Sequence, residues 1–433
     1  MRPNRDFSVI LVKPVSEILR SFCDPLSEIR AREAGRSAGV PIRPGSEAGA
    51  RGVEAESSRR TPGPPVLRSV SNLILRVASR HQSIARARRR SKKGVSERHS
   101  QRVLKHLDRR KTQRALTSAL RRQVKRFIPP GPVDIAVDLH ERTYYGEAID
   151  KNRPQYVRTK EERGTYRAYR YVTLGIVVHG FRFTVSCRYL DHRGKLVEVR
   201  QDVLADARKA GTQIERLYLD REFHTYDVLA WLQGQGLTVV LPLRLGSRQR
   251  KRWERGQKSY VVQHSIRDPR KKRGPITFRI HVVVCYQNGK NWDRRGCQYL
   301  IYAVLWHVPL GAPHAVPLER IQHPYRRRFG IESSFRIAHE ALPRTCARSV
   351  PWRLLYLGVS LMLQNVWYIL RLQYTSEGRQ APVGMVLREE VFRFQDMLEM
   401  LSLGVGRVLG TVREIGNPKP PPLRLRRWGM ALP

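Results

Sequence analysis

The sequence predicts a mixed α/β fold, in which a sheet with flanking helices carries an inserted β-rich section. Three observations indicate this fold class. Strand-like and helical runs alternate between residues 133 and 243, as they do in α/β domains. Two further strand-like runs follow a long basic segment, which indicates an insertion. A basic helical region precedes the whole pattern.

The N-terminal stretch has the composition of a segment without a packed core. Residues 29–66 are rich in Arg, Gly, Ser, Glu and Pro and show no hydrophobic period. Such composition is typical of disorder or of a linker. We therefore expect residues 1–66 to be a disordered extension, with translation from upstream of the true start as the alternative.

Residues 67–130 are predicted to form a basic helical region that binds DNA. Within it Leu116, Leu120, Val124 and Phe127 recur at intervals of 4, 4 and 3 residues, with Arg and Lys elsewhere. This spacing places one apolar stripe along a helix.

The chain becomes strand-rich after "IPPGP" at 128–132, where we place a domain boundary. His179 and Gly180 interrupt a long β-rich run and predict a hairpin there. The remaining runs are interpreted as strand, hairpin, helix, strand, helix and strand, at 133–140, 169–190, 197–211, 214–220, 225–236 and 237–243.

The inserted section is placed at about 244–312, inside a domain that spans 131–372. It begins with a very basic loop region at 244–275 and continues with strands at 276–286 and 298–306. A helix that ends near residue 340 follows the insertion and returns the chain to the α/β domain.

The apolar run at 354–370 is interpreted as a buried core helix. It contains Gln364 and Asn365 and is shorter than the roughly 20 apolar residues that cross a bilayer. We therefore expect no membrane association. Residues 373–433 are predicted to add a C-terminal helix and a basic, Pro-rich tail.

The charge of the chain favours a polyanionic partner. The sequence has 82 Lys and Arg against 37 Asp and Glu, a net charge of +45. Nucleic acid is the commonest partner of so basic a protein. The cationic run at 85–94 is accordingly interpreted as a phosphate contact, with a solvated arm as the alternative. The five cysteines are widely spaced, which favours neither a zinc module nor a disulfide framework.

Two carboxylates follow predicted strands. Asp138 and Asp220 each stand at the C-terminal end of a strand, where ligands bind in α/β sheets. A third carboxylate from a neighbouring helix would complete an oxygen-only site, which suits Mg²⁺ or Mn²⁺. Two such ions can act on one phosphodiester. A turn or cap residue is the alternative for each aspartate, and Asp134 and Glu222 are the rival carboxylates.

The third carboxylate is predicted to be Glu332, in "YRRRFGIESSFRIAHE" at 325–340. Tyr325, Arg328 and Glu332 are spaced by three and four residues, so they share one helical face. A surface ion pair between Arg328 and Glu332 is the alternative. Glu340, two turns further on, is the other carboxylate of this helix.

Three blocks together resemble the catalytic blocks of insertion-sequence DDE transposases: "DIAVDLHERTYYG", "LYLDREFHTYDVLAWL" and "YRRRFGIESSFRIAHE". They are most similar to the bacterial and archaeal group with a β-strand insertion and a Tyr-Arg-Glu-Lys signature. Tyr325, Arg328 and Glu332 match that signature in type and spacing. His339 stands where the group has lysine, and Arg336 is the nearby residue that could substitute.

The resemblance implies a ribonuclease-H-like catalytic domain in which Asp138, Asp220 and Glu332 hold two Mg²⁺ ions. Water would cleave a phosphodiester at the transposon end, and the freed 3′-OH would attack target DNA. It also implies a homodimer in the synaptic complex and a prokaryotic cytoplasmic location at the nucleoid.

DNA contacts are implied for Tyr325, Arg328, Arg336 and His339. Two alternatives stay open: a catalytically inactive remnant that only binds DNA, and a metal-dependent nuclease without strand transfer.

Overall fold

The computed structural model describes eleven ranges of the chain: 64–91, 93–128, 131–146, 155–162, 164–178, 181–191, 196–256, 258–286, 297–305, 335–373 and 388–409. The predicted extension at 1–66 lies outside them except for its last three residues. The C-terminal tail from residue 410 lies outside them entirely.

The N-terminal region is helical, as predicted. Its elements are α2 (Pro64–Ser79), α3 (Ile84–Arg89), α4 (Glu97–Lys105), α5 (Arg109–Val124) and the 3₁₀ turn η1 (Lys125–Phe127). Ser83, Ser96 and Asp108 each accept a hydrogen bond from the backbone N–H three residues later, which caps α3, α4 and α5.

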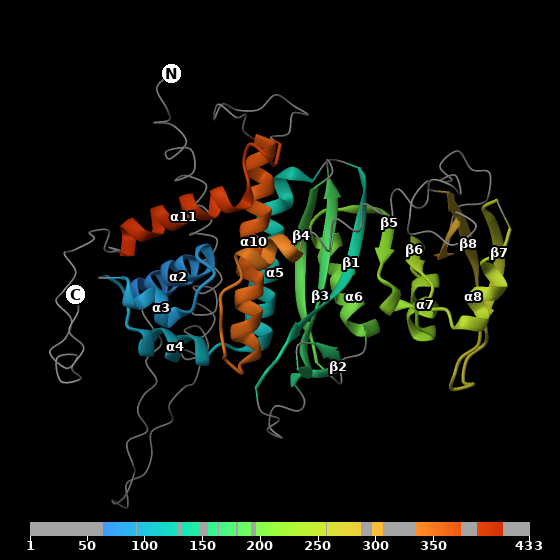
Figure 1. Ribbon diagram of the computed structural model, residues 1–433, viewed down its shortest axis with the longest axis horizontal. Helices are drawn as coiled ribbons and strands as arrows, with labels where there is room; N and C mark the ends of the chain where they lie inside the picture. The colour runs from blue at the N-terminus through green and yellow to red at the C-terminus, as the bar shows by residue number, and fades with distance from the viewer. Residues whose placement is uncertain are drawn as a thin grey trace, which may run out of the picture.

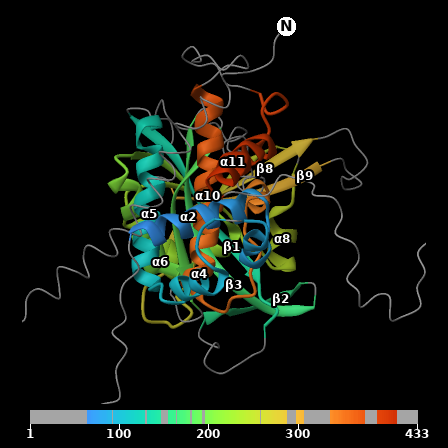
Figure 2. The same cartoon turned by 90° about the vertical axis from the view of Figure 1, so that its left-hand side faces the viewer.

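The apolar stripe of α5 is confirmed. Leu116, Leu120 and Val124 are buried, and the Phe127 ring stacks with that of Phe183 at 6.4 Å. Helix α5 packs against strand β4 and against helix α10 (Val350–Gln373), and Figures 1 and 2 both show α5 beside α10. A Cβ at Gly358 of α10 would lie 2.6 Å from Leu116, so glycine permits this close approach.

One sheet runs through the middle of the molecule (Figure 1). Its strands are β1 (Pro132–Thr143), β2 (Val157–Glu162), β3 (Thr165–Val178), β4 (Phe181–Leu190), β5 (Gln213–Leu219), β6 (Thr238–Pro242), β7 (Tyr260–Ile266), β8 (Ile276–Tyr286) and β9 (Cys297–Leu305). Strands β4, β3 and β1 are antiparallel, whereas β1, β5 and β6 are parallel. The predicted hairpin is confirmed, because Val178 pairs with Phe181.

Helices cover the sheet and its β4 edge. The two crossover helices are α6 (Leu196–Lys209) and α7 (Tyr226–Gln233), and α11 (Phe394–Leu409) packs on α2. Asp206 of α6 is 3% exposed and accepts hydrogen bonds from Ser186 Oγ at 2.7 Å and from Arg188 Nε at 2.9 Å, which ties α6 to β4.

Helix α10 confirms the interpretation of the apolar run at 354–370, because nearly all of its residues are buried. Asn365 projects from it onto β4, where its Oδ1 accepts from Thr184 N at 2.9 Å and its Nδ2 donates to Thr184 O at 2.8 Å. Among the described helices, none has the length and apolar character to cross a membrane.

The β insertion extends the main sheet, and the segment predicted as a basic loop region is partly ordered. Residues 244–275 include helix α8 (Ser247–Trp253) and strand β7, so the prediction of a loop throughout is wrong. Strand β9 pairs with β6, and β8 and β7 follow in turn, which continues the sheet to the right-hand end of Figure 1. The predicted strands at 276–286 and 298–306 correspond to β8 and β9.

Candidate active site

The structure brings Asp138 and Asp220 to adjacent strands at the same level. Strands β1 and β5 are parallel, and their register pairs Val137 with Leu219. Asp138 follows Val137 within β1, and Asp220 follows Leu219, the last residue of β5. The convergence that the sequence predicted for these two aspartates therefore follows from the strand register.

Both aspartates belong to the same face of the sheet. A small buried cluster on that face includes Ala136 and Tyr218, the residues two before each aspartate. Side chains alternate along a strand, so Asp138 shares the face of Ala136. The backbone of Asp220 is still extended, with φ −75° and ψ 161°, so the alternation carries through to it. Phe335 packs against the same cluster.

Local hydrogen bonds fix the two carboxylates. Asp138 is 6% exposed and accepts a hydrogen bond from Leu139 N at 3.0 Å. Asp220 caps the 3₁₀ turn η3 (Arg221–Phe223) and accepts from Arg221 N at 2.6 Å. Capping thus orients one oxygen of Asp220, and a carboxylate has further lone pairs for another ligand.

The rival carboxylates are held by arginines. Asp134 lies 3.4 Å from Arg216 Nε, and its other oxygen accepts from Tyr218 Oη at 3.4 Å. Glu222 lies 4.0 Å from Arg170 and 3.7 Å from Arg244. These ion pairs give both rivals a structural role beside the two aspartates.

The residue facing Asp138 fits a hydrated cation. Thr173 pairs with Asp138 across β1 and β3, is 2% exposed, and its hydroxyl has no hydrogen-bond partner in the part of the chain that the structure describes. A buried hydroxyl beside the Asp138 carboxylate is suited to a metal-bound water. Within the described ranges, no three His, Cys, Asp or Glu residues form a complete metal-binding group.

The signature residues Tyr325, Arg328 and Glu332 lie outside the described residues, so their roles stay predictions. The chain is described again from Phe335, in a helical segment at 335–340. Arg336 is exposed on this segment. The predicted third carboxylate is therefore three residues before a side chain that packs on the face of the two aspartates.

His339 lies in a cluster that the sequence analysis did not identify. Its imidazole contacts the Arg142 guanidinium and lies 3.4 Å from His140 Nε2, and the His140 ring stacks on Phe335 at 4.2 Å. Burial and the Arg142 charge lower the pKa of His339 to about 4, so the imidazole is neutral at pH 7. The predicted DNA contact of His339 stays a prediction.

The alternation of residues along β1 could have predicted part of this cluster from the sequence. Asp138, His140 and Arg142 alternate along the strand and therefore share one face.

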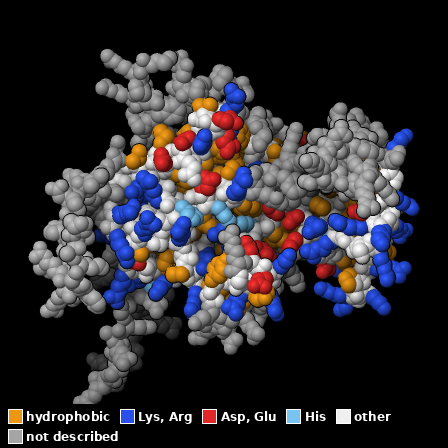
Figure 3. All heavy atoms as spheres, in the orientation of Figure 1, with side chains coloured by type: hydrophobic (Ala, Val, Ile, Leu, Met, Phe, Trp, Pro, Cys, Tyr) orange, Lys and Arg blue, Asp and Glu red, His pale blue; other side chains and the backbone are white. Residues whose placement is uncertain are grey.

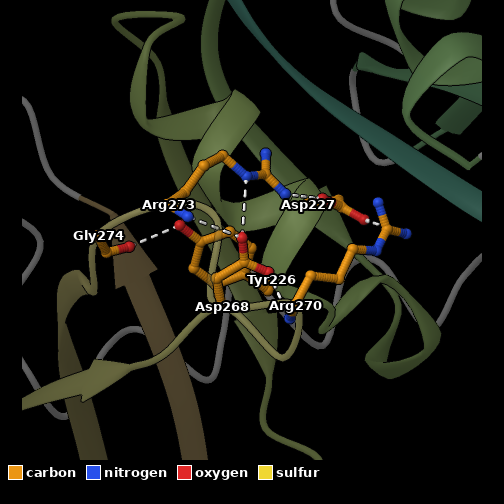
Figure 4. A network of polar contacts seen from close by, with 6 residues as sticks. All are labelled: Tyr226, Asp227, Asp268, Arg270, Arg273 and Gly274. Carbon is orange, nitrogen blue, oxygen red and sulfur yellow. Dashed lines mark hydrogen bonds and ion pairs between the residues drawn. The ribbon is translucent and has the colours of Figure 1, made fainter.

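A network of polar contacts fixes the basic segment that follows β7 (Figure 4). Asp268 accepts hydrogen bonds from the backbone N–H groups of Arg270 and Arg273, at 3.0 and 3.1 Å, and lies 3.3 Å from Arg273 Nε. Arg270 and Arg273 also form ion pairs with Asp227, which joins the segment to the start of α7. Lys271 and Lys272 stay exposed on it.

Positive side chains gather at two places on the face shown in Figure 3: over the N-terminal helices at the left and over α8 and β7 at the right. Acidic side chains lie between them.

Comparison with solved structures finds chains of similar fold. The chain is similar to piggyBac transposase, in a cryo-EM structure of the synaptic complex with hairpin DNA, with a TM-score of 0.52 and 12% sequence identity over 96% of this chain and 84% of that chain. No protein-family model matches the sequence, and no curated protein does.

The similarity to the piggyBac structure shows the fold and confirms the predicted class, a ribonuclease-H-like mixed sheet with flanking helices. The solved neighbour is itself a transposase. The narrower resemblance to the insertion-sequence group stays a prediction.

Proposed function

We propose that this protein is a DDE-type transposase, which cleaves the ends of its transposon and joins them to target DNA. The observation that carries the proposal is the placement of Asp138 and Asp220 at level positions on adjacent parallel strands. The net charge of +45 and the fold similarity to a transposase support it.

The catalytic residues of the proposal are Asp138, Asp220 and Glu332, which would hold one or two Mg²⁺ or Mn²⁺ ions. When bound, the divalent ions supply activation of the attacking oxygen and stabilisation of the leaving oxygen. The protein orients the two aspartates by backbone hydrogen bonds before any ligand arrives. Such preorganisation lowers the cost of assembling the reacting groups.

The arginines of the proposal hold phosphates. Arg328 would bind a phosphodiester through its planar, bidentate guanidinium, and Tyr325, three residues earlier in the sequence, would add a hydroxyl donor. Arg336 is exposed in the helical segment at 335–340, and its guanidinium would contact a further phosphate of the same DNA strand. Attack of water on the phosphorus at the transposon end breaks the P–O3′ bond, which leaves a 3′-OH on the transposon and a 5′-phosphate on the flanking strand. The transposon 3′-OH then attacks a phosphorus of target DNA, forms a new phosphodiester and releases the 3′-OH of the target strand.

The group of transposases, the oligomeric state and the cellular location in the proposal rest on the resemblance of the signature residues. Tyr325, Arg328 and Glu332 support membership of the insertion-sequence group with a β insertion. A homodimer on two transposon ends and a prokaryotic cytoplasmic location at the nucleoid belong to the same proposal.

The test is a nicking assay on a duplex that carries the inverted repeat flanking the gene. We expect Mg²⁺-dependent nicking by the wild type and its loss in Asp138→Asn, Asp220→Asn and Glu332→Gln. Asp134→Asn is the matched control, since Asp134 lies on the same strand and face as Asp138 but pairs with Arg216. DNA binding measured in parallel shows that each inactive variant still engages the duplex.

The outcomes separate the two alternatives. Binding without nicking by the wild type would identify an inactive remnant. Nicking without joining of a labelled end to a plasmid would identify a nuclease. Equal nicking by the wild type and Glu332→Gln would refute the assignment of the third carboxylate.

A further inference from the structure

A pocket of about 540 Å³ opens beside the C-terminal end of β1. The end of β1, the segment at 342–348 and the first turns of α10 line it. Its lining has four arginines, Arg142, Arg344, Arg348 and Arg353, and no Asp or Glu. Asp138 and Arg142 share a strand face and are four residues apart, which corresponds to about 13 Å along β1.

The positive charge of the pocket is concentrated in a concave, partly buried site. Arg142 is half-buried, and burial together with the nearby Arg353 charge lowers the pKa of its guanidinium, although Glu162 opposes this effect. Arg344 and Arg348 are exposed at the opening. Four guanidinium groups without a lining carboxylate favour an anionic ligand with several oxygens, such as a phosphodiester.

Aromatic side chains accompany the arginines. Tyr145 lines the pocket and is 62% exposed, so its ring is accessible to a ligand. Tyr144, also in the lining, is 2% exposed, and its hydroxyl has no hydrogen-bond partner among the described residues. Arg353 fixes this wall, since its Nε donates to Ala347 O at 2.6 Å and its guanidinium lies 5.4 Å from the centroid of the Tyr144 ring.

We propose that this pocket binds one unpaired nucleotide of a DNA strand, with the arginines on its phosphate and Tyr145 stacked on its base. The proposal rests on the proposed function, because it places that strand next to the carboxylates. The separation of about 13 Å between Asp138 and Arg142 along β1 places the pocket within a few nucleotides of the cleaved bond. Base stacking on an aromatic ring beside cationic groups is the usual mode for single strands.

The exposed thiol of Cys346 provides a probe inside the pocket. We would alkylate the full-length protein with iodoacetamide, in EDTA, and follow Cys346 by mass spectrometry with and without a six-nucleotide single strand. The strand should slow alkylation of Cys346 in the wild type. At the same concentration it should protect less in Tyr145→Ala and Arg344→Ala. Arg393→Ala, the same charge change at an exposed position on another part of the chain, should behave as the wild type.

Affinity measured by fluorescence anisotropy separates the two contacts. Tyr145→Ala should weaken binding by about five- to a hundredfold with an unchanged salt dependence, because stacking releases no counterions. Arg344→Ala should reduce the slope of log K against log salt by about one. An abasic nucleotide at the pocket position should weaken wild-type binding and leave the affinity of Tyr145→Ala unchanged.

Three results would overturn the proposal: equal protection of Cys346 in all four proteins, equal protection by inorganic phosphate alone, or equal protection by a blunt duplex. None of them involves cleavage, so the nicking assay decides the proposed function independently. If the wild type does not nick DNA but the single strand still protects Cys346, the pocket proposal holds and the proposed transposase activity is refuted.

Discussion

The contact of Asn365 with Thr184 makes a sharp prediction about what holds α10 on the sheet. Strand β4 pairs with β3 on one side, and on the other side Asn365 hydrogen bonds both polar backbone groups of Thr184. Asn365 is 0% exposed, so no water replaces it in the folded state. We expect Asn365→Leu to destabilise the protein substantially, although leucine fills the space and suits a helix.

The magnitude follows from the two groups that lose their partners. Leaving one buried backbone donor or acceptor unsatisfied costs about 1–3 kcal/mol. Two such groups at Thr184 give about 2–6 kcal/mol. Ser360→Ala is the matched control on the same helix: Ser360 is also 0% exposed, but its hydroxyl donates to Leu357 O within α10, and this is its only hydrogen bond among the described residues. It should cost less than about 1 kcal/mol.

Two measurements check the Asn365 prediction. Guanidinium unfolding gives the change in stability, and hydrogen exchange of the peptide that covers β4 reports the Thr184 amide directly. Amide exchange at β4 should accelerate in Asn365→Leu and stay slow in Ser360→Ala. A loss below about 1 kcal/mol in Asn365→Leu, with unchanged exchange at β4, would refute the reasoning that these hydrogen bonds hold the edge strand.

Three further predictions concern charges. Asp206→Ala should lower stability by about 1.5–3 kcal/mol, since Ser186 and Arg188 both lose a buried charged acceptor, although Arg188 keeps its contact with Asp202. Asp202→Ala, whose carboxylate is 62% exposed, should cost less than about 1 kcal/mol in the same denaturation experiment. Burial, helped by the Arg279 charge, lowers the pKa of His281 to about 4, so its unfolded form binds more protons. The stability that His281 contributes as a neutral group is therefore complete above pH 6.5 and is lost as pH falls toward 4. Between pH 6.5 and 5 the loss of stability due to His281 is at most about 2 kcal/mol, and His281→Gln should flatten that part of the pH–stability curve. Finally, replacing Lys271 and Lys272 together by alanine should reduce the salt slope of DNA binding by about two, and an unchanged slope would remove this segment from the interface.

The sequence was sufficient for the features that local patterns encode. Asp138 and Asp220 were correctly predicted to lie beside each other, because each follows an apolar run and the two runs form adjacent parallel strands. The predicted end of the first strand at Asp138 was wrong, because β1 continues to Thr143 through its pairing with β3. The core helix at α10 was predicted from its apolar length. These inferences needed no knowledge of distant contacts.

The features that the sequence did not predict depend on partners far along the chain. Strand β7 was taken for loop because its surroundings are dominated by Arg and Lys, whereas β8 supplies its hydrogen bonds. The alternation of β1 places Arg142 on the face of Asp138, but its contact with His339 joins residues 197 positions apart, and the alternation does not identify that partner. Thr173 was missed for the same reason, since only the β1–β3 register places it opposite Asp138.

The pairing of β6 with β9 has a mechanical consequence for any DNA that the molecule holds. Strand β6 at Val239–Pro242 pairs with β9 at Tyr302–Leu305, so the outer strands are a rigid extension of the central sheet. The outer strands resist rotation relative to the central sheet, because such a rotation would break the hydrogen bonds between β6 and β9. A duplex that contacts both the carboxylates and Lys271 would therefore have to bend, since the protein does not. DNA sequences that kink easily would bind with a lower deformation energy.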